Sequence, residues 1–167
     1  MIVRLAKIAI AFSAGVLILL VALDNVFDYG VNFDVVQHIL SMDMVPESPL
    51  KWRAVTSPTL HHLCYWFIIA TEFVSAGLTL WGAWSLWQAR AGRAAIFNSA
   101  KGIALVGLCV GFLLYFFGFM TVGGEWFQMW RAGVYNMQEP AFRFIGSIGL
   151  AMIFLALADM ELSEKAR

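Results

Sequence analysis

Two ionisable residues, Glu72 and Arg143, stand inside long apolar runs of the sequence. A carboxylate in the middle of a lipid layer costs on the order of 2.5–3.5 kcal/mol, so Glu72 must face protein or water. It is either a protonatable or cation-coordinating group on a transport or ligand path, or a structural carboxyl hydrogen-bonded to Thr71, Ser75 or a neighbouring helix. Arg143 is expected to extend outward or to pair with Glu139, four residues earlier. It pairs with Glu72 only if their two helices are neighbours.

A polar cluster follows the first apolar run. Its members recur at intervals of three and four residues and share one face if a single helix continues through them: Asp24, Asn25, Asp28, Tyr29 and Asn32. Such a face closes the end of a helix bundle with hydrogen bonds, or binds a cation through oxygen atoms. We expect the structural role, with cation binding as the alternative.

The three histidines raise the question of a metal or haem site. His61 and His62 stand at the start of the second apolar run, and His38 lies in the polar segment before it. A metal site that combines any of them with Asp34 or Asp43 is chemically reasonable but lacks a diagnostic spacing. Haem ligation between two helices is not indicated, because the other apolar runs contain no histidine. Polar loop histidines are the alternative interpretation.

No motif indicates an enzyme. The sequence has no nucleotide-binding glycine loop, no Gly-x-Ser-x-Gly and no His-Glu-x-x-His. We therefore expect no catalytic residue and no cofactor.

Composition places these residues in a membrane. Of the 167 residues, 61% are hydrophobic and 13% are charged, against about 45–50% and 25% in a soluble domain. Four apolar blocks, at about 5–26, 63–87, 102–120 and 141–158, approach the ~20 residues that a crossing requires. All four prolines lie outside the blocks, as unbroken helices in lipid require. We predict an all-α membrane protein with one domain, a bundle of four transmembrane helices.

Basic residues are divided unequally between the two ends of this bundle. Seven lie beside the termini and in the loop 88–101, and four lie on the other side: Lys51, Arg53 and Arg131 in the loops 27–62 and 121–140, and Arg143 near the start of the fourth block. The positive-inside rule then places both termini in the cytoplasm and the two longer loops outside. Eleven basic and eleven acidic residues balance, so no overall field attracts nucleic acid. The lipid bilayer is the expected environment. Association with a membrane-protein partner or with a second copy of the chain is left open.

The two outer loops are each expected to hold a short amphipathic helix. The first covers 32–42, where the apolar residues share one face: Phe33, Val36, Ile39 and Leu40. The second includes Glu125 and places Trp126 and Trp130 on one helical face. Both helices are expected to lie on the membrane surface or to cap the bundle.

Aromatic and small residues give further expectations for the second and third blocks. The aromatic residues mark the two membrane interfaces of the second block: Tyr65 and Trp66 at its start, and Trp81, Trp84 and Trp87 at its end. The small residues allow close helix packing, within the chain or with a partner: Gly107 and Gly111 in the third block, and Ser75, Thr79 and Ala83 in the second.

Several of these motifs resemble one known family. They are Asp24-Asn25-x-x-Asp28-Tyr29-x-x-Asn32-Phe33, His38-x-x-Ser41-Met42-Asp43, the isolated Glu72, and Gly123-Gly124-Glu125-Trp126-Phe127-x-Met129-Trp130 leading to Ala141-Phe142-Arg143. The family is a bacterial one of predicted small integral membrane proteins of unknown function (domain of unknown function 2165). The resemblance covers nearly the whole chain. It implies four spans, a bacterial inner-membrane location and important outer segments, but no established activity.

Three function classes remain open. The leading hypothesis is a non-enzymatic membrane protein whose outer cap, Asp24 to Asp43 with Glu125 to Arg143, binds a partner protein, a lipid or a small ligand. An accessory subunit or a self-associating bundle would fit it. The alternative is a proton- or cation-coupled transporter or channel component that uses Glu72. A third class is a redox protein that holds quinone or metal on the outer face.

Overall fold

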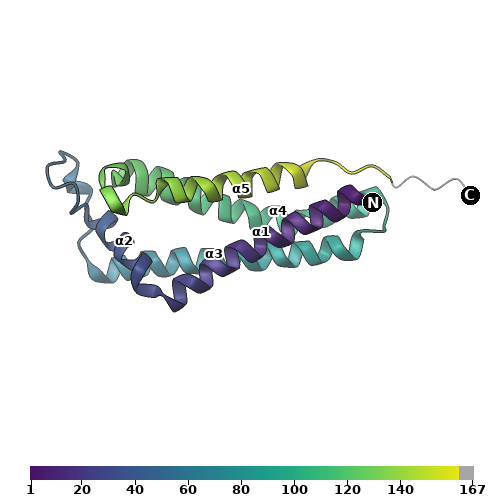
Figure 1. Ribbon diagram of the computed structural model, residues 1–167, viewed down its shortest axis with the longest axis horizontal. Helices are drawn as coiled ribbons and strands as arrows, with labels where there is room; N and C mark the ends of the chain where they lie inside the picture. The colour runs from purple at the N-terminus through teal and green to yellow at the C-terminus, as the bar shows by residue number, and fades with distance from the viewer. Residues whose placement is uncertain (162–167) are drawn as a thin grey trace, which may run out of the picture.

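Four long apolar helices run side by side in the computed structural model, which describes residues 1–161 (Figure 1). They are α1 (Ile2–Phe27), α3 (Pro58–Ala89), α4 (Ala94–Leu113) and α5 (Gln138–Ala156). Each belongs to a helical segment long and apolar enough to cross a membrane. No strand occurs among the described residues. The predicted all-α membrane bundle is confirmed.

The loop 27–62, which the sequence places outside, contains the helix that the sequence predicts. This helix, α2 (Tyr29–Ser41), follows α1 after a turn at Asp28, whose φ of −115° and ψ of 53° are not helical. It ends where Met42 adopts a left-handed φ of 49°. The ammonium group of Lys51 then donates to the carbonyl oxygens of Ser41 and Met42, which satisfies groups that a helix end leaves free. A short 3-10 turn, η1 (Lys51–Arg53), leads toward α3.

The loop 121–140 differs from the prediction. After Leu113 the third spanning helix widens into a π-helix, η2 (Leu114–Trp126), so the whole element covers Ala94–Trp126. Beyond it Gln128 has a left-handed φ of 56°, and two 3-10 turns follow, η3 (Met129–Arg131) and η4 (Gly133–Tyr135). Trp126 and Trp130 therefore belong to different elements and share no helical face. The physical cause is the turn at Gln128, whose side chain accepts a hydrogen bond from Ser48 in the first loop.

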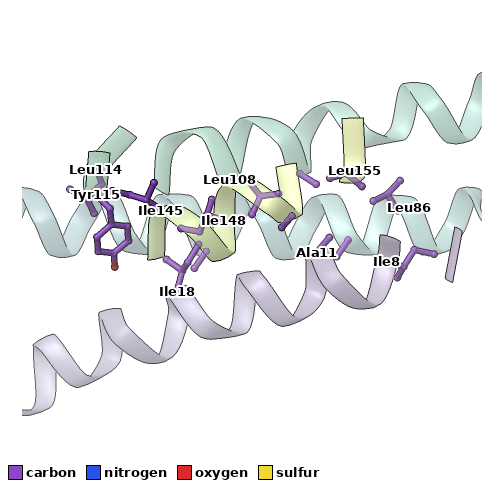
Figure 2. Packing of buried hydrophobic residues seen from close by; sticks show 14 of the residues in the cluster. Ile8, Ala11, Ile18, Leu86, Leu108, Leu114, Tyr115, Ile145, Ile148 and Leu155 are labelled. Carbon is purple, nitrogen blue, oxygen red and sulfur yellow. The ribbon is translucent and has the colours of Figure 1, made fainter. Parts of the chain in front are cut away.

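Buried apolar residues form two clusters. The longer one runs between the spanning helices, where Ile18, Leu108 and Ile148 meet (Figure 2). The smaller one joins the loops 27–62 and 121–140, and Met42 and Met129 are its most deeply buried members. We call the end of the bundle with α2 and these loops the capped end.

Helices α3 and α4 pack with almost no space between their backbones. A Cβ atom on Gly82 would lie 2.2 Å from the main-chain nitrogen of Ala104, and one on Gly107 would lie 2.5 Å from that of Thr79. The hydroxyl of Ser75 donates to the carbonyl oxygen of Gly107 at 2.7 Å. These small residues therefore pack within the chain, which is one of the two possibilities that the sequence left open.

The opposite end of the bundle, the basic end, holds buried charges. Asp159 lies after α5, and its Oδ2 accepts hydrogen bonds from the ammonium groups of Lys7 and Lys101, each at 2.6 Å. Arg4 donates to carbonyl oxygens of the α3–α4 loop and of Met160. Arg4, Lys7, Lys101 and Asp159, here named the basic anchor, tie both ends of the described chain to α4.

Candidate functional site

Glu72 lies near the middle of α3 and is only 1% exposed. Each of its carboxyl oxygens accepts a hydrogen bond. The side-chain amide of Asn25 on α1 donates to Oε2 at 2.7 Å, and the hydroxyl of Tyr115 on η2 donates to Oε1 at 3.1 Å. Three elements therefore converge on this one carboxyl group.

Asn25 connects Glu72 to the capped end. Its side-chain oxygen accepts hydrogen bonds from the amide of Asn32 at 2.7 Å and from the hydroxyl of Tyr65 at 3.2 Å. The same hydroxyl lies 3.2 Å from the main-chain oxygen of Asn25. The network thus includes residues of α1, α2, α3 and η2, and both polar atoms of the Asn25 side chain have partners.

The turn at Asp28 brings Asn25 and Asn32 together. In one continuous helix these residues would be about 10 Å apart along the axis. Because α1 ends at Phe27 and α2 folds back over the end of α3, the two side chains meet directly. The single helical face expected from the spacing does not form, yet two of its five members join the same network.

A cavity of about 120 Å³ has Glu72 in its wall. Its polar lining residues are those of the network: Asn25, Asn32, Tyr65, Glu72 and Tyr115. The remaining wall is apolar and comes from α1, α2, α3, η2 and the start of α5. An engineered apolar cavity of about 150 Å³ in another protein admits benzene. This cavity therefore has room for a group of a few non-hydrogen atoms beside a carboxyl group.

An apolar groove of about 250 Å³ adjoins the cavity. The two share Val35, Val36, Ile68 and Phe119, and the groove is lined by residues of α2, α3 and η2. None of its lining residues is charged, and Cys64 is among them. The cavity beside Glu72 thus shares part of its wall with an apolar groove.

The bundle is closed on the side of Glu72 that faces the basic end. One turn along α3, Ser75 is fully buried against α4. A Cβ atom on Gly111 would lie 2.6 Å from the Ser75 hydroxyl oxygen and 3.3 Å from Ile18. The cavity is therefore lined only from the capped half of the molecule.

Arg143 does not contact Glu72. It pairs with Glu139 at 2.7 Å on the surface of α5, where the two side chains are 73% and 81% exposed. No ion pair among residues 1–161 includes Glu72. The carboxyl group of Glu72 is therefore surrounded by neutral donors.

The other members of the polar cluster lie outside the cavity. Asp24 and Asp28 are exposed. The hydroxyl of Tyr29 lies 2.8 Å from Nδ1 of His62, and the ring of Phe33 stacks on that histidine at 4.0 Å. Burial raises the pKa of Tyr29, so this hydroxyl stays protonated while it is hydrogen-bonded to His62.

The remaining histidines make separate contacts. Nδ1 of His38 lies 2.7 Å from the Asp43 carboxylate, and its Nε2 lies 3.5 Å from that of Asp34. His61 is buried and donates from Nε2 to the carbonyl oxygen of Val55 at 2.7 Å. Within residues 1–161 no group of three or more His, Cys, Asp or Glu residues is placed to hold a metal ion.

The outer aromatic candidates lie on the surface of the capped end. Glu125, Trp126 and Trp130 are exposed. The guanidinium group of Arg53 lies 4.3 Å from the centre of the Trp126 ring. None of these residues lines the cavity beside Glu72.

Two tyrosines of the site were not recognised from the sequence. Tyr65 was expected at the membrane interface but is 1% exposed, whereas its neighbour Trp66 is 57% exposed. Tyr115, inside the third apolar block, stacks on Phe144 with ring centres 4.4 Å apart. A buried tyrosine hydroxyl usually has a hydrogen-bond partner. A tyrosine in an otherwise apolar run therefore indicates a polar contact inside the bundle.

The chain matches a family model described as "Predicted small integral membrane protein (DUF2165)" over residues 3–158. No curated protein and no solved structure matches the chain.

Proposed function

The chain belongs to this family of predicted small integral membrane proteins, and we propose that it binds a small ligand within the membrane, in the cavity beside Glu72. The single observation that carries the proposal is the cavity itself. A buried carboxyl group and its network form one part of the wall, and the rest is apolar.

Three features of the site support ligand binding. Small-molecule sites are mostly apolar and contain a few well-placed polar groups, as this cavity does. An ionisable residue inside a membrane is costly enough to suggest a function. Tyr115 also lies in the first turn of a π-helix, and π-helical turns are frequent at functional sites.

Filling the cavity tests this proposal. Ala141 is buried in the cavity wall on α5, so Ala141→Phe places a ring in the ligand's space. Gly146→Phe on the same helix is the matched control, because no atom lies within 4 Å of a Cβ at that position. Native mass spectrometry of protein extracted from its own membranes should detect a bound small molecule on the wild type and on Gly146→Phe. Ala141→Phe should have lost it.

A second filled variant guards against misfolding. Val36→Phe enters the same cavity from α2, and circular dichroism checks that each variant keeps its helices. If folded Ala141→Phe and Val36→Phe carry the same bound masses as the wild type, ligand binding in this cavity is wrong.

Proton or cation transport through Glu72 is the second candidate. The cost of an intramembrane carboxyl group favours it, but the packing of Ser75 against α4 closes the route toward the basic end. Flux into proteoliposomes that falls in Glu72→Gln but not in the exposed control Glu125→Gln would establish transport. Equal flux in both variants would contradict transport through Glu72.

We propose a bacterial inner-membrane location with the basic end in the cytoplasm, because seven of the eleven basic residues lie on that side of the sequence pattern. In a chain without Cys64 and Cys109, a cysteine at exposed Glu47 should react with an impermeant maleimide in intact spheroplasts. A cysteine at exposed Ala91 should react only after lysis. The reverse pattern would invert the topology. Association of the capped end with a membrane partner or a second copy stays a prediction.

A further inference from the structure

We propose that the ligand is a small organic cation: a protonated amine whose nitrogen pairs with Glu72 and whose apolar body extends into the groove beside the cavity. This inference rests on the proposed function and names the class of ligand.

The charge balance around Glu72 favours a cation. Asn25 and Tyr115 both donate hydrogen bonds to the carboxyl group, and no Lys, Arg or His side chain within residues 1–161 pairs with it. A carboxylate has about four acceptor sites, so two hydrogen bonds leave capacity for a further donor. A buried charge is costly without an opposite one, and an ammonium group in the cavity would supply both the charge and the donors.

The aromatic wall favours the same ligand. The cavity is lined by the rings of Tyr65, Tyr115, Phe119 and Phe144. Cations are attracted to the faces of such rings, more strongly when water is excluded. An anionic group would meet the Glu72 carboxylate, which would repel it.

The apolar groove favours an apolar body for the part of the ligand that lies outside the cavity. It lies beside the cavity and shares Val36 and Ile68 with the cavity wall, and it is lined by no charged residue. An apolar chain or ring system placed there loses contact with water or headgroups at no polar cost. A ligand that occupies both of these adjacent spaces is therefore an amphiphile with one positive end.

Three probes with the same chain and different ends test the inference: octylamine, 1-octanol and octanoate. Binding is measured by the shift of the thermal unfolding midpoint in phosphatidylcholine nanodiscs at pH 7. Each concentration is corrected for partition into empty nanodiscs. Wild-type protein should bind octylamine about tenfold or more tighter than 1-octanol, since a close charge pair contributes at least that factor. It should bind octanoate weakest.

Glu72→Gln should lose the preference for octylamine, whereas the exposed control Glu125→Gln should keep it. Tyr115→Phe retains the Glu72 carboxyl group and removes one hydroxyl that donates to it. This variant should therefore keep the preference for octylamine, and it tests the inference even if Glu72→Gln does not fold. Equal binding of octylamine and 1-octanol, or a preference that persists in Glu72→Gln, overturns the cation assignment and leaves ligand binding intact. If no probe binds saturably, the result counts against both proposals.

Discussion

Asn25 holds the site together at the scale of single residues. It donates to Glu72 and accepts from Asn32 and Tyr65, whereas Tyr115 makes one hydrogen bond to the same carboxyl group. Buried polar groups that lose a partner are costly, and a hub leaves several of them unpaired at once.

Asn25→Ala should therefore destabilise the protein more than Tyr115→Phe. We expect a loss of about 3 kcal/mol for Asn25→Ala and about 1 kcal/mol for Tyr115→Phe. Thermal unfolding midpoints in one detergent rank the two variants. An equal or smaller effect of Asn25→Ala would show that the network is not built around this side chain.

The sequence identifies only part of this network. Glu72 is found from its cost inside an apolar run, and Asn25 and Asn32 are found from their spacing. Their partners Tyr65 and Tyr115 could not be assigned, because which helices are neighbours depends on packing between distant segments. The turn at Asp28 also replaces a shared helical face with a direct contact.

At the scale of elements, the contact between α3 and α4 depends on Gly107. An added methyl group there would lie 2.5 Å from backbone and side-chain atoms of Thr79, so the helices must separate. Gly102 on the same helix has open space around a Cβ and provides a matched control.

Gly107→Ala should lower the free energy of unfolding by about 2 kcal/mol, the usual cost of overpacking. Gly102→Ala should leave it unchanged or raise it by about 0.5–1 kcal/mol, because alanine favours a helix over glycine. Denaturation in mixed micelles measures both. Effects of the same sign and size would contradict the close contact.

The sequence predicts a helix in a loop where local periodicity alone determines that helix. Helix α2 was predicted from its apolar face, and its start at Tyr29 lies close to the expected 32. The second outer helix was not formed, because the path after Trp126 depends on partners far away in the chain. Ser48 binds Gln128, and Arg53 packs on Trp126, so local periodicity is overruled there.

At the scale of the whole molecule, the basic anchor joins the first and last described segments. Composition predicted the four-helix membrane bundle, but it did not reveal that Lys7 and Lys101 are buried against Asp159. Asp159 lies beyond the last apolar block, so no pattern marked it as a partner. Burial alone would raise the pKa of Asp159, but hydrogen bonds from Lys101 and Lys7 outweigh it and hold the pKa below its usual value.

Removing this charge should loosen the basic end. Asp159→Asn leaves two buried ammonium groups without their carboxylate and should cost about 3 kcal/mol near pH 7. The exposed control Glu139→Gln should cost less than about 1 kcal/mol. Unfolding midpoints measure both, and a neutral Asp159→Asn would contradict a stabilising anchor.

The same anchor predicts a pH dependence. Because the folded pKa of Asp159 is depressed, its stabilisation is fully present above the unfolded value near 3.8 and is lost as the pH falls through the folded value. The difference in unfolding midpoint between wild type and Asp159→Asn should therefore be constant from about pH 7 to 5 and narrow in stronger acid. A difference independent of pH would contradict the ion pair.

The central claim is that a ligand can occupy the cavity beside Glu72. Photolabelling with a diazirine-bearing octanol in nanodiscs, followed by peptide mapping, tests it most directly and without assuming a charge on the ligand. The account predicts saturable adducts on Glu72 or Tyr115 that vanish in Ala141→Phe and persist in Gly146→Phe. Adducts confined to exposed residues of the spanning helices outside the cavity and the groove, such as Leu150 and Ile153, and unchanged by Ala141→Phe, would contradict it.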